Sequence, residues 1–95
     1  MDQKEAYVKK AQAELDLLQA RLDGLEAKAR KSEADGEIKY HQQIAALKAK
    51  RDSAKDYLSA LNQSGIDAWG ELKEGLSRAV GDLKSALDRA ASRFQ

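Results

Sequence analysis

The feature that most constrains this chain is a narrow apolar stripe that stays in step from Val8 to Leu61, named here the apolar seam. Its apolar or small residues recur at intervals of mostly three and four positions, which is the spacing of helices that pack along one stripe. The sequence therefore predicts an all-α chain. The seam consists of Val8, Ala11, Leu15, Leu18, Leu22, Leu25 and Ala29, followed by Tyr40, Ile44, Leu47, Ala54, Leu58 and Leu61.

The composition agrees with this prediction. Charged residues make up 35% of the 95 positions, aromatic residues make up 5%, and proline is absent, a balance typical of long helices and coiled coils. A chain of this length allows one domain and buries only about 60–65% of its unfolded surface. We therefore expect a single helical coiled-coil domain over residues 1–95, which a partner chain would help to stabilise.

The segment around Gly36 decides between two architectures. Asp35 and Gly36 form a dipeptide that often marks a turn, and a turn near Gly36 would give a three-helix bundle. Without a turn, one helix runs from about residue 3 to 63 and is about 90 Å long at 1.5 Å per residue. The absence of proline and the helix-supporting pair of Asp35 with Lys39 favour the continuous helix. We therefore expect an antiparallel helical hairpin, with the three-helix bundle as the alternative.

A reversal of the chain is predicted at residues 64–66. If Gly65 is the left-handed residue that ends the long helix, Ile66 and Leu61 form the hydrophobic pair of a Schellman motif. Asp67 can then cap a return helix over about residues 67–94. The long helix and the return helix together make the expected hairpin.

The return helix is built by tandem repetition. The segments AWGELKEGLSR (68–78) and AVGDLKSALDR (79–89) are identical at six of eleven positions. An eleven-residue period corresponds to about 3.67 residues per turn, so an apolar stripe drifts little on a straight helix. We expect this stripe to pack on the second half of the seam. The predicted hairpin contacts join Tyr40, Ile44, Leu47, Leu58, Leu61 and Ile66 to Trp69, Leu72, Leu76, Val80, Leu83, Leu87 and Phe94.

The first half of the seam has no partner in such a hairpin. A return helix about 40 Å long covers only the second half of its neighbour, and exposed apolar surface is unfavourable by about 25 cal/mol per Å². We therefore expect a homo-oligomer, most simply an antiparallel dimer in which two N-terminal halves cover each other. The predicted self-association residues are Val8, Ala11, Leu15, Leu18, Leu22, Leu25 and Ala29.

Little in the sequence suggests catalysis. With no cysteine and a single histidine, His41, one chain cannot assemble a catalytic triad, a histidine-pair metal site or an HExxH motif. Carboxylate pairs such as Asp52 with Asp56 are typical of a solvated helix face. We predict a non-enzymatic protein with no catalytic residues, no metal site and no cofactor, and we expect His41 to be solvated or packed at an edge.

The charge pattern also limits the class of partner. There are 17 Lys and Arg residues against 16 Asp and Glu, for a net charge of +1, and the two signs interleave, whereas nucleic-acid binding needs clustered positive charge. The N-terminus lacks the features of a signal peptide, and no stretch approaches the ~20 apolar residues of a membrane span. We expect a cytoplasmic protein that acts through helix–helix contacts with its own copies or with a protein partner.

Two side chains carry specific alternatives. Trp69 is interpreted as an anchor of the return helix, but it could instead enter a membrane interface, which makes conditional membrane or lipid binding through residues 67–94 the alternative function. The mixed charge of that helix argues against lipid binding, because membrane-surface helices are rich in Lys and Arg. Arg51 occupies a seam position, where a charged side chain either reaches solvent or fixes the alignment of the helices.

Three stretches resemble the small bacterial coiled-coil proteins of a stress-response family. They are IKYHQQI (38–44), GIDAWGELK (65–73) and AASRF (90–94). Members of that family often carry a second tryptophan in the second eleven-residue copy, where this chain has Val80. The resemblance implies a cytosolic helical protein connected with stress, and it supplies no catalytic residues.

Overall fold

The structure is a computed structural model that describes residues 3–31, 34–65 and 67–93, with positions 34–39 described by their backbone alone. Over these ranges it contains α-helices and no strand. The helices are α1 (Gln3–Lys31), α2 (Ala34–Gln63) and α3 (Trp69–Arg93). The prediction of an all-α chain is confirmed for the described residues.

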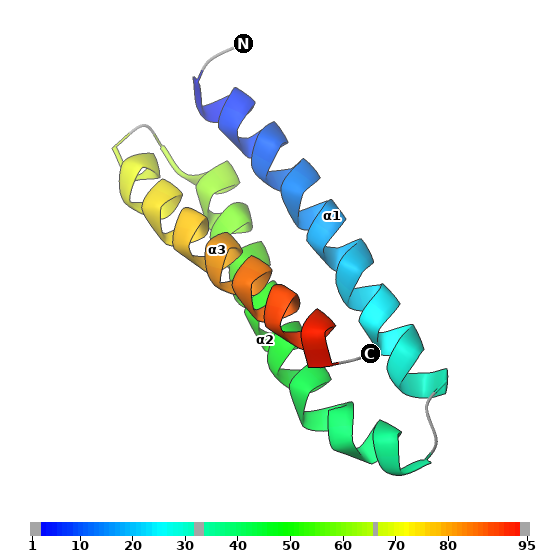
Figure 1. Cartoon of the computed structure of the whole chain (residues 1–95). Coiled ribbons are helices and arrows are strands. Elements are labelled where there is room, and N and C mark those ends of the chain that lie inside the picture. The colour runs from blue at the N-terminus through cyan, green and yellow to red at the C-terminus, as the bar shows by residue number, and fades with distance from the viewer. Residues whose placement is uncertain (1–2, 32–33, 66, 94–95) are drawn as a thin grey trace.

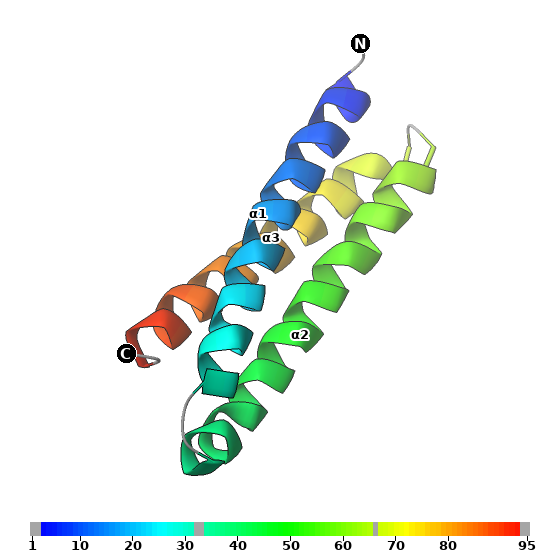
Figure 2. The same ribbon diagram turned by 90° about the vertical axis from the view of Figure 1, so that its right-hand side faces the viewer.

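The helices lie side by side along one long axis (Figure 1). α1 and α3 run in the same direction and α2 runs in the opposite direction, so that α2 packs against both of its neighbours. The view turned by 90° in Figure 2 shows the same arrangement. The described chain measures 50 × 20 × 18 Å along its principal axes, which is shorter than the long helix expected from the continuous seam.

The structure therefore corrects the expectation of one continuous helix over about residues 3–63. α1 ends at Lys31 and α2 begins at Ala34, while residues 32–33 lie outside the described ranges. The Nζ atom of Lys48 lies 3.1 Å from Oε2 of Glu26, although a straight helix would separate these residues by about 33 Å. Gly36 itself lies within α2.

Burial explains the interruption. Folding α1 back covers the first half of the seam within the same chain, and each leucine removed from water contributes about 1.5–3 kcal/mol. A pair of opposite charges four positions apart in a helix contributes only a few tenths of a kcal/mol. Burial of the leucines is the larger contribution, so α1 folds back on α2 and α3.

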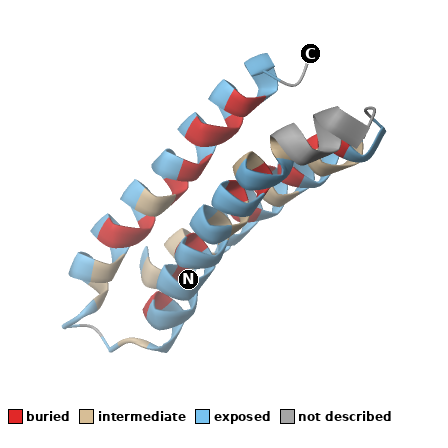
Figure 3. Ribbon diagram, turned by 90° about the horizontal axis from the view of Figure 1, so that it is seen from below, coloured by how far each residue is buried: buried red, intermediate tan, exposed pale blue. Residues whose placement is uncertain are grey.

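The core unites the two halves of the seam with the stripe of α3, as the red segments of Figure 3 show. Among the described residues no polar or charged residue is buried as a whole. The five largest side chains that are fully buried come from all three helices, so each helix depends on the other two. They are Leu22, Leu61, Leu76, Leu83 and Leu87.

The residues predicted for self-association lie inside this core. Val8 is partly buried against it, and Ala11, Leu15, Leu18, Leu22, Leu25 and Ala29 are buried. The bare stripe from which the dimer was inferred is thus covered by the same chain, which corrects that step of the inference. Self-association itself stays a prediction.

The residues predicted for hairpin packing also contribute to the core. Tyr40, Trp69 and Leu72 are partly buried against it, and Ile66 and Phe94 lie outside the described ranges. The remaining members are buried, namely Ile44, Leu47, Leu58, Leu61, Leu76, Val80, Leu83 and Leu87.

The connection between α2 and α3 differs from the predicted Schellman motif. No described residue, Gly65 included, has a positive φ, so the left-handed conformation is not used there. Instead, the backbone N–H and the hydroxyl of Ser64 both donate to the carbonyl of Leu61, at 3.2 and 2.8 Å. A serine hydroxyl can satisfy a free carbonyl at a helix end as a glycine turn does. The chain reverses where the sequence predicts it, but the helix end is stabilised by hydrogen bonds from Ser64 instead of a left-handed glycine.

Two glycines of α3 give the first testable prediction. A Cβ added at Gly81 meets nothing within 4 Å, whereas one added at Gly75 would overlap the ring of Tyr57. Gly81→Ala is therefore expected to raise the free energy of unfolding by about 0.5–1 kcal/mol, because alanine loses less backbone entropy in a helix. Gly75→Ala has the same propensity gain but must displace Tyr57, so we expect it to be about 1 kcal/mol less stable than Gly81→Ala. Urea unfolding followed by circular dichroism compares the two, and equal stabilisation would contradict the packing of Tyr57 on α3.

Candidate functional site

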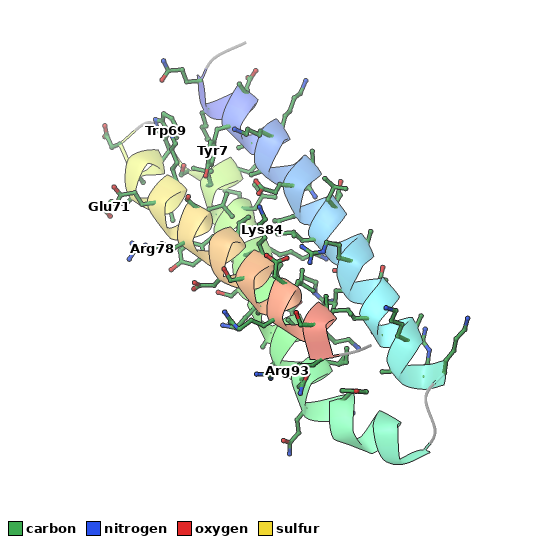
Figure 4. All side chains as sticks on the ribbon, viewed as in Figure 1. Tyr7, Trp69, Glu71, Arg78, Lys84 and Arg93 are labelled. Carbon is green, nitrogen blue, oxygen red and sulfur yellow. The ribbon has the colours of Figure 1, made fainter. Side chains whose placement is uncertain are left out.

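The most distinctive side-chain cluster joins the start of α1 to the connection between α2 and α3. It is named here the aromatic clasp and consists of Lys4, Tyr7, Trp69 and Lys73. The Nζ atom of Lys73 lies 5.1 Å from the ring centroid of Tyr7 and 5.3 Å from that of Trp69, both within the range of a cation–π interaction. Figure 4 shows Tyr7 and Trp69 at the same end of the molecule.

Lys4 completes the aromatic clasp. Its ammonium donates to the carbonyl of Asn62 at 3.3 Å and also to the carbonyl of Ser64. The last carbonyls of a helix lack partners within the helix and carry partial negative charge, which a cation stabilises. The first turn of α1 is thereby held against the C-terminal end of α2.

Trp69 anchors α3 as the sequence interpretation held, since it is partly buried against the core. Tyr7, whose ring shares the ammonium of Lys73 with the ring of Trp69, was missed by the sequence reasoning. The available signal was the position of Tyr7 directly before Val8, where it widens the apolar stripe. Tyr7 also donates a long hydrogen bond of 3.4 Å from its hydroxyl to the carbonyl of Lys73, so α1 and α3 share both an aromatic and a polar contact.

The environment of Tyr7 predicts a loss of stability at high pH. Burial and then the nearby Glu14 carboxylate raise the pKa of the Tyr7 phenol above its ordinary value of 10.0. Because the neutral phenol is favoured in the folded state, this contribution is fully present below the unfolded pKa and is lost as the pH rises through the folded pKa. As the pH rises through and above the ordinary pKa of 10.0, the wild type should therefore lose more stability than Tyr7→Phe. Urea unfolding of both proteins across this range measures the difference, and parallel pH profiles would contradict it.

Polar contacts along the flanks join neighbouring helices. Arg21 Nη2 lies 2.7 Å from Oδ1 of Asp88, which links α1 to α3. Glu26 accepts from Lys48 at 3.1 Å and links α1 to α2. These side chains are partly solvent-exposed, and exposed ion pairs contribute only about 0–1 kcal/mol each. They therefore add little to the stability that the core provides.

Arg51 lies where the sequence placed a charged residue on the seam. Its side chain is 20% exposed and pairs with Asp52 at 2.8 Å, and its Nη1 donates to Oε1 of Gln19 at 3.3 Å. The guanidinium thus reaches across from α2 to α1. The side chain is also partly exposed, so whether Arg51 reaches solvent or fixes the alignment of the helices stays a prediction.

The other end of α3 is held by Tyr40. The Tyr40 hydroxyl donates to the backbone carbonyl of Arg93 at 3.0 Å. This contact satisfies one of the last carbonyls of α3 from a side chain of α2. The predicted core position of Tyr40 therefore combines a partly buried ring with a polar contact.

Grooves run between each pair of helices. One of about 320 Å³ lies between α2 and α3, and it is lined by Lys50, Ser53, Tyr57, Gly75, Arg78, Ala79 and Asp82. One of about 310 Å³ lies between α1 and α3, and it is lined by Tyr7, Lys10, Ala11, Glu14, Ser77, Val80 and Gly81. Their linings mix both charge signs with small residues.

His41 lies on the surface, as the sequence interpretation held. It lines a further groove, of about 270 Å³, between α1 and α2 together with Glu26, Arg30 and Lys48. Within the part of the chain that the structure describes, no group of three or more His, Cys, Asp or Glu side chains is placed to hold a metal ion.

No protein-family model, curated protein or solved structure matches this chain. The resemblance to stress-response coiled-coil proteins therefore stays a prediction. None of the helices, over their described residues, is long and apolar enough to cross a membrane.

Proposed function

We propose that this protein is a non-enzymatic helical protein that works as a three-helix bundle and acts through helix–helix contacts with another protein chain. The observation that carries the proposal is the shared core, to which α1, α2 and α3 all contribute fully buried leucines. A core of this kind gives a stable scaffold with no ligand inside it. In this proposal the charged flanks and grooves are the surface that a partner meets.

The polar side chains support this proposal because their contacts join the helices to one another. Arg21 and Glu26 join neighbouring helices through ion pairs. The hydroxyls of Tyr40 and Ser64 donate to carbonyls at helix ends. Each of these groups has a partner within the fold. The resemblance noted in the sequence favours a cytoplasmic protein connected with stress.

Circular dichroism without added ligand tests the proposal. The bundle is expected to show high helicity at micromolar concentration and one cooperative thermal transition, because small domains with a single core unfold in a two-state manner. Helicity that develops only after a ligand or a membrane is added would contradict the proposal.

Lipid binding through residues 67–94 is the second candidate function. It is favoured by the apolar stripe that follows α3 along its length. However, Leu76, Leu83 and Leu87 are fully buried, so lipid contact requires α3 to leave the core. Co-sedimentation with vesicles rich in phosphatidylserine separates the candidates, since pelleting of the protein would favour lipid binding and an unchanged supernatant would favour the bundle.

A further inference from the structure

A further groove, of about 180 Å³, lies between α2 and α3 toward the C-terminal end of α3. Lys50 from α2 and Arg89 and Arg93 from α3 line it, and we name it the basic groove after these residues. None of the described residues in its lining is acidic, whereas each of the three grooves described above has a carboxylate in its lining. The lining also includes small side chains, namely Ala46, Ala86 and Ala90.

The three cations of the basic groove have no counterions in the fold. In the part of the chain whose side chains are described, none of these cationic groups forms an ion pair or a hydrogen bond, whereas Arg21, Lys48 and Arg51 are all paired. The sequence also places no acidic residue three or four positions away from any of the three. All three side chains are exposed. Their charges are therefore available to a group from outside the chain.

The arrangement of the two arginines favours a carboxylate as that group. Arg89 and Arg93 lie four positions apart on one face of α3, a spacing at which like charges destabilise a helix. The dipole of α3 favours a cation in its last turn, which accounts for Arg93 alone. A carboxylate between the two guanidinium groups relieves their repulsion, and the planar fork of arginine matches carboxylate oxygens in a bidentate way.

The shape of this surface favours a helix as the bearer of the carboxylates. Lys50 also lines the groove of about 320 Å³ between α2 and α3, whose lining includes Arg78. Arg78 and Arg93 are about 22 Å apart along α3 at 1.5 Å per residue, which corresponds to about four turns of a partner helix. Figure 4 shows both arginines along the side of α3 that faces away from α1. Small side chains between two helices let the ridge of a third helix approach closely.

We propose that the basic groove binds an acidic helix of a partner protein, whose carboxylates pair with Lys50, Arg89 and Arg93. The inference rests on the proposed helix–helix mode of action and specifies the chemistry of the partner. The net charge of the whole chain is only +1, so the attraction is confined to this surface. A nucleic acid is the less suited polyanion, because it needs positive charge clustered over a longer surface.

A designed peptide tests the acidic partner. The probe is a fluorescein-labelled peptide of Glu-Ala-Ala-Ala repeats, about twenty residues and therefore about 30 Å long when helical. Fluorescence anisotropy at low ionic strength is expected to show that it binds the wild type, and added salt should weaken the binding because exposed charges are screened. A peptide of Gln-Ala-Ala-Ala repeats has the same length without the charge and is expected not to bind.

Two double variants locate the binding. Arg89→Gln with Arg93→Gln is expected to weaken binding of the acidic peptide about tenfold, since two exposed ion pairs are lost. Lys28→Gln with Lys84→Gln removes the same charge at exposed positions outside the basic groove and is expected to change the affinity by less than about twofold. All four positions are exposed, so circular dichroism should show the same helicity for both double variants and the wild type.

Three results would overturn the inference. The first is an acidic peptide that does not bind the wild type, and the second is an equal loss of affinity in the two double variants. The third is an oligothymidine of the same charge that binds as tightly as the acidic peptide. Circular dichroism of the same samples separates this inference from the proposed function. A helical, cooperatively unfolding protein that ignores the acidic peptide would overturn the acidic partner and leave the proposed bundle intact.

Discussion

Replacing Leu22 with alanine is expected to lower the free energy of unfolding by about 3 kcal/mol, within the range of about 2–5 kcal/mol for buried leucines. Leu22 has an exposed fraction of 0%, so truncating it leaves a cavity that the three helices must share. Urea unfolding measures the change. Because the contacts of Leu22 lie within one chain, the loss should be the same at every protein concentration.

Leu17→Ala is the matched control for Leu22→Ala. Leu17 lies on the same helix with 68% of its surface exposed, and substitutions at such positions change stability by less than about 0.5 kcal/mol. The sequence interpretation places Leu22 at an interface between copies. The loss in free energy of unfolding caused by Leu22→Ala could instead shrink as the protein becomes more dilute. That result would support an interface between copies and would contradict the shared core within one chain.

Placing a carboxylate at position 54 is expected to unfold the protein. Ala54 has an exposed fraction of 0%, so the new side chain of Ala54→Asp would lose its hydration without a paired cation, a cost of several kcal/mol per ion. The whole free energy of unfolding of a small domain is only about 5–15 kcal/mol. Ala60→Asp provides the control, because Ala60 is exposed on the same helix. Thermal melts followed by circular dichroism should show a large loss of cooperative unfolding for Ala54→Asp alone, and comparable melts for both variants would contradict the core position of Ala54.

The apolar residues could be predicted from the sequence because helix packing depends on a periodic pattern. Leu15, Leu47 and Leu83 come from three different helices and are buried, as their spacing predicts. The reversal after Leu61 was also predictable, since several turn-forming residues follow one another there. What the pattern specifies is which face of each helix is buried.

The pattern does not specify which chain covers that face. Local signals near Gly36 are worth a few tenths of a kcal/mol, and they favour the helix that Gly36 in fact occupies. α1 ends at Lys31 and α2 begins at Ala34, and the folding back of α1 depends on its burial against α2 and α3. That burial is a long-range effect which no window of sequence contains.

The aromatic clasp was beyond sequence reasoning for the same reason. Tyr7 and Lys73 are 66 positions apart, and only the direction of α1 relative to α3 brings them together. Tyr57 and Gly75 meet likewise across α2 and α3. Arg51 was recognised as unusual because its charge interrupts an apolar position, which is a local signal.

Small-angle scattering of the size-separated chain at micromolar concentration tests the central claim, namely that one chain covers its own seam. The account predicts a monomer of 10.5 kDa with a radius of gyration close to the 15.3 Å of the structure. A chain that carries the continuous helix of about 90 Å would give a radius of gyration of about 26 Å or more. That larger value at micromolar concentration would contradict the account.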